Sequence, residues 1–146
     1  MADFATRRFP VSIKGVVTAP DARVLLLRND RGEWELPGGR PERGESPEQC
    51  VRREIREETG WEVAAVRILD AWMYEPLPDA FVFVTTYGCR LVSGGARPVV
   101  SDEHTMFGLF AETEVPELNM PDGYKRSVLS WFAGPAAAPD TRGGAA

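Results

Sequence analysis

A segment with unusually complete helix signals lies near the middle of the chain and limits the folds available to it. Ser46 is suited to the N-cap, Pro47 to the first helical position, and Gln49 completes a capping box. Gly60 supplies a stop signal, because glycine is favoured just past the last turn of a helix. The sequence therefore predicts a helix over residues 46–59 that any fold must accommodate.

This predicted helix has three chemically different faces. Val51 and Ile55 are spaced to face a core, and two arginines, Arg52 and Arg56, lie roughly opposite. A third flank carries three carboxylates, those of Glu54, Glu57 and Glu58. Like charges three or four residues apart on a helix destabilise it by about 0.2 to 0.5 kcal/mol per pair. We therefore expect a cation beside this flank.

Strand patterns and turn residues alternate along the rest of the chain. Residues 24–27 are continuously apolar, which is typical of a strand buried on both faces. The predicted strands cover residues 11–18, 23–28, 63–74, 81–91 and 106–110, and a last helix covers residues 122–132. Residues 76–79 and 93–95 read as turns. An early and a terminal helix among these strands predict an α/β fold, an α/β/α sandwich with a mixed central sheet.

Length and charge exclude some classes of function. The chain has 146 residues, and we expect one domain over residues 1–132 and a disordered tail over the small, Pro- and Gly-rich residues 133–146. The formal net charge of -5 argues against binding to duplex nucleic acid. No apolar run is long enough to span a bilayer and the first residues lack the apolar core of a secretory signal, so we expect a cytoplasmic protein. Cys50 and Cys89 are expected to be reduced structural thiols.

The carboxylates belong to a longer pattern. From Gly39 onward the chain reads G-x5-E-x7-R-E-U-x-E-E-x-G-U, where U is a bulky apolar residue. This pattern resembles the box of the Nudix hydrolases, and the preceding residues 34–38, WELPG, are similar to that family as well. Trp61 stands at the last position, where the family normally has an aliphatic residue, and an aromatic ring there can still pack against the sheet. The resemblance implies a Nudix-like fold and hydrolysis of a phosphoanhydride bond.

Clustered carboxylates suit a hard cation with oxygen ligands, so we expect Mg²⁺, or Mn²⁺ in its place. Such an ion would neutralise a diphosphate and activate a water molecule for attack on phosphorus. The resemblance implies that Glu54, Glu57 and Glu58 bind the metal directly or through water, with the Gly38 carbonyl as a further ligand. It also implies that Arg53 orients Glu57.

Two roles stay open at this level. Glu45 either stabilises the N-terminus of the helix or takes part in catalysis. The general base is either Glu54 or Glu103, which lies in a polar segment before the strand that ends at Phe110. His104 is expected to be a polar neighbour rather than a metal ligand.

Specificity must come from residues outside the box. Trp34, Trp72 and Tyr74 are candidates to stack on a base, and Arg28 and Arg40 are candidates to contact phosphates or a terminal sugar. Pro76 lies fifteen residues beyond Trp61, close to a proline in the ADP-ribose-cleaving branch of the family. This favours a small-molecule nucleoside diphosphate derivative, ADP-ribose or a nucleotide sugar, as the substrate.

Two alternatives are a (d)NTP pyrophosphohydrolase of the house-cleaning type and a non-catalytic Nudix-like module that senses a nucleotide. Sensors of this kind usually have a broken carboxylate set, whereas the set here is complete. The sequence therefore favours catalysis. A homodimer is also an expectation, since small enzymes commonly form one.

Overall fold

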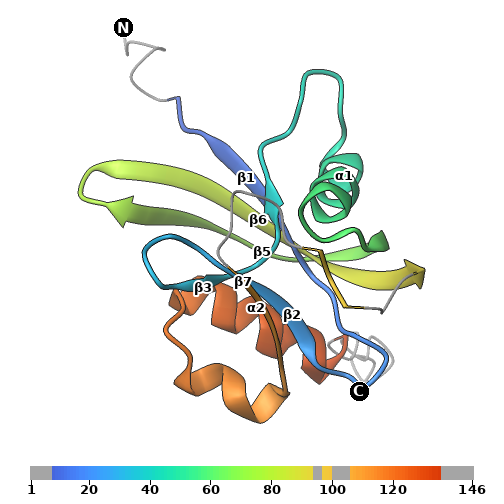
Figure 1. The fold of residues 1–146 in the computed structure, drawn as a ribbon. Helices are drawn as coiled ribbons and strands as arrows, with labels where there is room; N and C mark the ends of the chain where they lie inside the picture. Colours follow the sequence, from blue (N-terminus) through green and yellow to red (C-terminus); the bar gives the residue numbers. More distant parts are fainter. Residues whose placement is uncertain (1–7, 94–96, 100–105, 136–146) are drawn as a thin grey trace, which may run out of the picture.

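A computed structural model describes residues 8–93, 97–99 and 106–135 of the chain. Its elements, in chain order, are β1 (Val11–Val16), β2 (Val24–Arg28), β3 (Trp34–Glu35), β4 (Gly38–Gly39), α1 (Pro47–Thr59), β5 (Glu62–Leu77), β6 (Ala80–Ser93), β7 (Met106–Phe110), the 3-10 helix η2 (Glu112–Glu117) and α2 (Asp122–Ala133). Figure 1 shows α1 on one side of the strands and α2 with η2 on the other.

The strands form two sheets rather than one. A four-stranded sheet has the order β4-β1-β6-β5, in which β1 is parallel to β6 and the other pairs are antiparallel. A three-stranded antiparallel sheet has the order β3-β2-β7. The predicted α/β/α fold with a mixed sheet is confirmed, and the division of its strands into two sheets is a feature that the sequence pattern did not predict.

Alternate residues of the strands face two separate apolar clusters. Ile13 and Val17 belong to the cluster under α1, whereas Val16 belongs to the cluster under α2. In β2, Leu25 faces the first cluster and its neighbour Leu26 the second, and both are fully buried. The prediction that β2 is buried on both faces is therefore confirmed.

Helix α1 has the ends that the sequence predicts. The Ser46 hydroxyl accepts a hydrogen bond from the Gln49 amide, and the Gln49 side chain accepts one from the Ser46 amide, which completes the capping box. Gly60 ends the helix with a positive φ of 76°, a conformation that glycine adopts without a steric penalty. Trp61 is 2% exposed and packs in the cluster under α1.

Some predicted boundaries are wrong. Residues 76–79 are not a four-residue turn: β5 runs to Leu77 and β6 begins at Ala80, so that only Pro78 and Asp79 separate the two strands. Asp79 has a positive φ of 62°, which fits a tight hairpin turn. The short strands β3 and β4 and helix η2 are absent from the prediction, because two-residue strands are defined by their pairing and carry no period of their own.

The terminal helix extends to Ala133, one residue beyond the predicted end. Most of the expected tail, residues 136–146, lies outside the described part of the chain, so its disorder stays a prediction. No helix in the described part of the chain is long and apolar enough to cross a bilayer.

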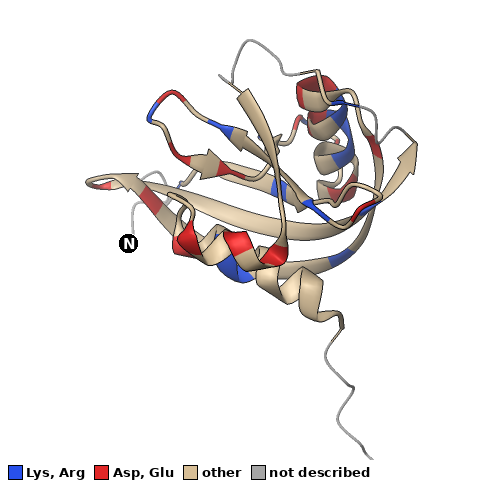
Figure 2. Ribbon diagram, turned by 60° about the horizontal axis from the view of Figure 1, so that its bottom comes forward, with Lys and Arg blue, Asp and Glu red and all other residues tan. Residues whose placement is uncertain are grey.

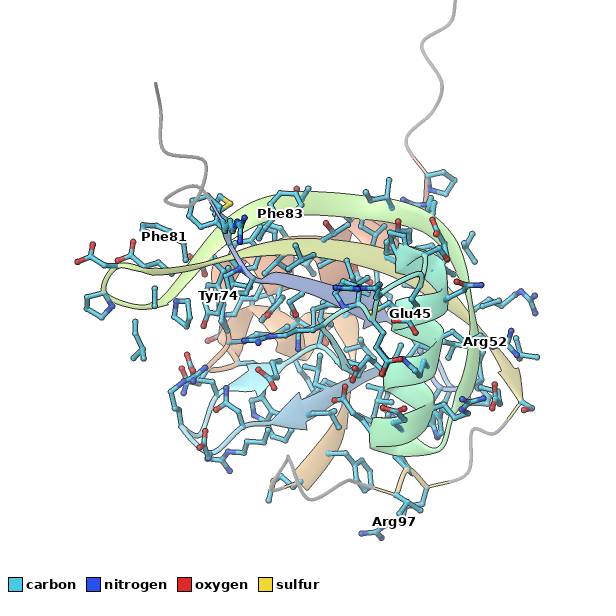
Figure 3. The ribbon with its side chains drawn as sticks, turned by 90° about the horizontal axis from the view of Figure 1, so that it is seen from above. Glu45, Arg52, Tyr74, Phe81, Phe83 and Arg97 are labelled. Carbon is cyan, nitrogen blue, oxygen red and sulfur yellow. The ribbon has the colours of Figure 1, made fainter. Side chains whose placement is uncertain are left out.

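Part of the four-stranded sheet is not covered by α1. Figure 3 shows Phe81 and Phe83 over this part of the sheet, well apart from Arg52 on the far flank of α1. Both phenylalanines are 38% exposed, and the Phe81 ring makes an edge contact with Phe9 at a centroid distance of 6.4 Å. The homodimer expected from the sequence stays a prediction.

Candidate active site

The glycine strand β4 lies directly against α1. The Gly38 amide donates a hydrogen bond of 3.0 Å to Oε1 of Glu58, whose side chain is buried. A Cβ atom added to Gly39 would lie 2.6 Å from the carboxyl carbon of Glu54. A Cβ on Gly38, which has a φ of +142°, would collide with the backbone at Ile13. The absence of side chains here lets the strand approach both carboxylates closely.

The three glutamates of the acidic flank differ in their environments. Glu58 is 2% exposed, the Glu54 side chain is 16% exposed and the Glu57 side chain is 55% exposed. Figure 2 shows that acidic and basic residues are interleaved along α1. The helical period thus places the three residues on one side of α1, but only Glu54 and Glu58 are held against the glycine strand.

Arg53 connects the carboxylates to one another. Its guanidinium donates to Glu45 at 2.6 and 3.0 Å, to Oε1 of Glu54 at 2.9 Å and to Oε2 of Glu57 at 3.2 Å. A further bond of 3.1 Å to the Arg40 carbonyl ties it to the loop after β4. Arg53 therefore does contact Glu57, as the resemblance implies, but its shortest contact, at 2.6 Å, is with Glu45.

The Arg53–Glu45 ion pair shifts the pKa values of both of its members. Hydrogen bonds from Arg53, followed by the Glu42 backbone, lower the pKa of Glu45 from its usual 4.5 to about 2. The same hydrogen bonds raise the pKa of Arg53 above its usual value. This geometry supports a role for Glu45 that differs from both roles considered from the sequence. Glu45 anchors Arg53, the arginine that holds Glu54.

The donor set suits a divalent cation. Carboxylate oxygens from α1 and the Gly38 carbonyl are hard oxygen ligands of the kind that Mg²⁺ prefers, and the glycine strand approaches Glu54 more closely than a residue with a side chain could. No group of three His, Cys, Asp or Glu side chains in the described residues is already gathered closely enough to hold an ion. Arg53 and the Gly38 amide donate hydrogen bonds to carboxylate oxygens of Glu54, Glu57 and Glu58, the oxygens that would bind a metal.

A buried lysine close to these groups was missed by the sequence analysis. Lys14 lies on β1 directly opposite Gly38 and is 8% exposed. Burial alone would lower the pKa of its ammonium, but the charges of nearby groups, Tyr124, Glu35, Glu58 and Glu54, outweigh this and raise the pKa. The pKa of Tyr124 is itself raised by burial, so its phenol is neutral near pH 7 and the carboxylates stabilise the ammonium.

The candidate substrate-binding residues lie in three separate groups: Arg40 alone, Arg28 with Trp34, and Tyr74. Arg40 is exposed beside Arg53, which binds its carbonyl. The Arg28 guanidinium lies 5.9 Å from the ring centroid of Trp34, and Trp34 packs edge-on against Phe110 at 4.8 Å. Tyr74 belongs to a different aromatic group, and burial raises its pKa. Glu103, the other candidate base, lies outside the described residues, as does His104.

The cysteines are free and buried. The Cys50 thiol contacts the Gly39 carbonyl at 3.6 Å, and burial together with the charge of Glu45 raises its pKa to about 12. Burial raises the pKa of Cys89 to about 12 as well. Both thiols are therefore protonated at neutral pH, as the sequence analysis expected of structural cysteines.

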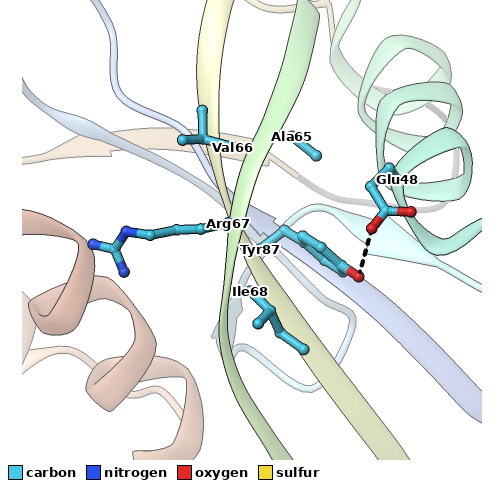
Figure 4. A pocket seen from close by; sticks show the side chains of 6 residues that line it. All are labelled: Glu48, Ala65, Val66, Arg67, Ile68 and Tyr87. Atoms are coloured by element: carbon cyan, nitrogen blue, oxygen red, sulfur yellow. Dashed lines mark hydrogen bonds between the residues drawn. The ribbon is translucent and has the colours of Figure 1, made fainter. Parts of the chain in front are cut away.

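A hollow of about 200 Å³ lies where β5 and β6 pass the beginning of α1. Figure 4 shows Tyr87 in this hollow, where its hydroxyl donates a 3.1 Å hydrogen bond to Glu48, while Arg67 points to the other side of the strand. The Arg67 guanidinium lies 5.0 Å from the ring centroid of Trp131 on α2. None of the six lining residues is a box glutamate, so we do not place the reaction there.

Comparison with curated proteins gives close relatives. A MutT-like protein of Streptomyces ambofaciens is 54% identical over 85% of this chain and 77% of its own length. A Bacillus subtilis protein named as a candidate 8-oxo-dGTP diphosphatase is 51% identical over 75% of the chain, and one named as a candidate ADP-ribose pyrophosphatase is 30% identical over 66%. The chain covers about half of the length of these two relatives, 56% and 48%.

The fold and the sequence profile agree with these relatives. The MutT protein of Methanosarcina mazei superposes with a TM-score of 0.71 at 24% identity, covering 86% of this chain and 93% of that one. The family model described as the NUDIX domain matches residues 8–132, which include the glycine strand, α1 and all of α2 except its last residue. The chain therefore belongs to the Nudix hydrolase family.

Proposed function

We propose that this chain is a divalent-metal-dependent pyrophosphohydrolase that cleaves a phosphoanhydride bond of a nucleoside di- or triphosphate, with its reaction centre between β4 and α1. The observation that carries the proposal is the pairing of Glu54 and Glu58 with a side-chain-free strand, held by the Gly38 hydrogen bond and the approach of Gly39. When bound, Mg²⁺ or Mn²⁺ would supply charge neutralisation of the phosphates and activation of water.

The residues of the chain have separate tasks in this proposal. Glu58 and Glu54, with the Gly38 carbonyl, would hold the ion, and the more exposed Glu57 would reach it directly or through water. Arg53 positions Glu54 and Glu57 by hydrogen bonds rather than binding phosphate. Arg40, exposed beside this network, is the candidate to contact a phosphate.

In the reaction, an oxygen of water forms a bond to phosphorus and the anhydride P–O bond on the opposite side breaks, so that the second phosphate leaves with the bonding pair. The proton lost by the water goes to the general base. Glu54 is our candidate for this base, because Arg53 and Gly39 fix the position of its carboxylate. Glu103 is the alternative base.

A nucleoside triphosphate is our first candidate substrate. The relatives named MutT-like and 8-oxo-dGTP diphosphatase share 54% and 51% identity with the chain, compared with 30% for the relative named ADP-ribose pyrophosphatase. This reverses the order that Pro76 favoured, since a single proline inside a long strand is a weaker indication than identity over most of the chain. ADP-ribose is the second candidate, supported by that third relative.

A hydrolysis panel tests the proposal. The wild type is assayed with Mg²⁺ on the four dNTPs, 8-oxo-dGTP and ADP-ribose, and products are separated by chromatography. Glu58→Gln and Glu54→Gln should each lower kcat by about a hundredfold or more through lost metal activation. Glu62→Gln, which removes a carboxylate paired with Arg52 and Arg56 on the surface, should stay within about twofold.

Measurements of metal and nucleotide binding distinguish a wrong assignment of the metal-binding residues from a chain that binds nucleotides without cleaving them. Isothermal titration with Mn²⁺ should show weaker metal binding in Glu58→Gln than in Glu62→Gln. Near-normal turnover of Glu58→Gln and Glu54→Gln would overturn the assignment of these residues. Tight nucleotide binding without turnover by the wild type would instead favour the sensing module.

A further inference from the structure

The face of the four-stranded sheet that carries α1 is apolar and exposed where the helix does not reach. We call this part the open sheet face and define it by five side chains with their exposed fractions: Phe9 (48%), Ile68 (56%), Met73 (45%), Phe81 (38%) and Phe83 (38%). Figure 3 shows Phe81 and Phe83 on it, away from α1. The Phe9 ring joins them through its edge contact with Phe81, at 6.4 Å between centroids.

The strand pairing places the β5 and β6 members of this set on one side of the sheet. Met73 is paired with Phe83, and paired residues of neighbouring strands point to the same side. Phe81 lies two residues before Phe83 in β6, so it faces that side as well. Ile68 is paired with Tyr87, whose hydroxyl reaches α1. The open sheet face therefore extends continuously from the β5–β6 hairpin to the beginning of α1.

Its area is that of one side of a stable interface between two proteins. A large apolar side chain has about 150 to 250 Å² of surface, so the exposed fractions of the five residues correspond to roughly 400 Å². About 60% of an interface is apolar, so this patch implies roughly 700 Å² for each partner and roughly 1,300 Å² in total. Specific interfaces bury about 1,200 to 2,000 Å². Two copies of the open sheet face, laid against each other, supply enough area.

The charged residues lie at the ends of the open sheet face rather than within it. Glu48 is exposed at the α1 end, and Glu75, Asp79 and Arg8 are exposed toward the hairpin end. Anionic lipid surfaces attract clusters of basic residues, whereas three of these four residues are acidic. Aromatic residues and methionine in the middle, with charges at the rim, are typical of protein interfaces. The composition therefore favours a protein partner over a membrane.

We propose that two copies of this chain associate through their open sheet faces, as a dimer whose two-fold axis runs across the strands. An identical partner fits because an isologous interface needs only one self-complementary patch, and this patch is apolar throughout. This inference does not depend on the proposed function, since neither the metal site nor a nucleotide takes part in it.

Helix α1 determines the direction of the axis. Facing sheets pack about 10 Å apart, and one helix alone is about 10 Å wide. If both copies had α1 at the same end, the two helices would therefore occupy the same space. With the axis across the strands, the β5–β6 hairpin of each copy lies toward the α1 end of its partner. The hollow of about 200 Å³ lined by Glu48, Ile68 and Tyr87 leaves room for it there.

Sedimentation equilibrium tests the association with a matched pair of substitutions. The full-length wild type, at about 1 to 100 µM and without nucleotide, should show a monomer–dimer equilibrium. Met73→Glu places a charge within the open sheet face and should raise the dissociation constant of the dimer by at least about tenfold. Met106→Glu makes the same change at a methionine of β7 that is 44% exposed, and should stay within about twofold of wild type. Ile68→Glu is the second variant, and circular dichroism identifies any variant that fails to fold.

Cross-linking tests the direction of the axis. Met73 lies near the middle of the open sheet face, so it should meet the Met73 of the partner across an axis that runs across the strands. Met73→Cys should form cross-linked dimers with a short bismaleimide, whereas Met106→Cys should give no more product than the wild type. Cys50 and Cys89 are buried, so they contribute little background. Absence of cross-linking in a dimeric Met73→Cys protein would overturn the proposed axis.

The remaining outcomes identify other occupants of the open sheet face. A wild type that stays monomeric at 100 µM would overturn the inference, as would a dimer that neither Met73→Glu nor Ile68→Glu weakens. A monomer that dimerises only after deletion of residues 1–7 would assign the face to that segment instead. A monomer that floats with neutral phosphatidylcholine vesicles, unless it carries Met73→Glu, would assign it to lipid. Because masses are measured without nucleotide, failure of hydrolysis would overturn the proposed function alone.

Discussion

Replacing Gly39 by alanine should separate activity from stability. The new Cβ would lie 2.6 Å from the Glu54 carboxyl carbon, whereas ordinary contact begins at 3.4 Å, so the carboxylate must retreat by about 0.8 Å. The three heavy atoms nearest to that Cβ all belong to the Glu54 carboxylate, the end of a flexible side chain, so the fold can accommodate the change. A displacement of about 1 Å at a reacting group costs of the order of a hundredfold in rate. We expect kcat to fall by about tenfold to a hundredfold.

We expect Gly39→Ala to lower activity but not stability, and an alanine at a second glycine, Gly134, to lower stability but not activity. Gly39→Ala should shift Tm by less than about 2 °C, because the substitution itself reduces the freedom of the unfolded chain. Gly134→Ala is the control: Gly134 has a φ of 80° and open space around its Cβ position, so alanine there is strained without touching the site. It should lower Tm by about 2 to 4 °C, a cost of about 1 kcal/mol, and leave kcat unchanged.

A double mutant identifies the route of the effect. If Gly39→Ala acts through Glu54, then adding it to Glu54→Gln should cause little further loss, since the two changes disable the same group. The assay is initial-rate hydrolysis of the best nucleotide, with thermal unfolding followed by circular dichroism. Full activity in Gly39→Ala would refute the placement of Glu54 against the glycine strand as a requirement of catalysis, and additive losses would refute the route through Glu54.

Two further predictions concern acid stability and thiol reactivity. Because the pKa of Glu45 is lowered from 4.5 to about 2, its ion pair with Arg53 should stabilise the protein fully above pH 4.5 and lose this effect as pH falls toward 2. Glu45→Gln should therefore be less stable than wild type at pH 6, with the difference shrinking below pH 4.5 in urea unfolding at each pH; a constant difference would contradict the assignment. Cys50 and Cys89, both buried with pKa values of about 12, should react with iodoacetamide at pH 8 only after unfolding in urea, whereas rapid labelling of the native protein, detected by mass spectrometry, would show that the thiols are accessible.

The helix and the fold class could be predicted from sequence because their signals are local. The capping box of Ser46 and Gln49, and the stop at Gly60, each depend on neighbours within a few residues. The family pattern then indicates the fold. The division into two sheets depends on pairings between distant strands, such as β1 with β6, for which a single sequence has no local signal.

The site was predicted less completely. The helical period places Glu54, Glu57 and Glu58 together, but their different exposure depends on β4, a strand that exists only through its pairing with β1. Lys14 alternates with apolar Ile13 in β1, a pattern that normally indicates a solvent-facing side chain. The structure buries the Lys14 side chain nevertheless, and the burial depends on elements distant in the sequence that a local pattern does not indicate. The strongest contact of Arg53, with Glu45, spans eight residues and depends on the loop geometry before α1.

The two apolar clusters divide the core of this fold into two parts, and the residues that pack in one part can change over evolutionary time independently of those in the other. Neighbouring residues, such as Val16 and Val17, pack in different clusters. A substitution in the cluster under α2 therefore leaves the packing under α1 intact. The aromatic residues Trp72, Tyr74 and Tyr124 all belong to the α2 side. Selection for a new nucleotide can thus remodel that side while the helix that carries the glutamates keeps its support.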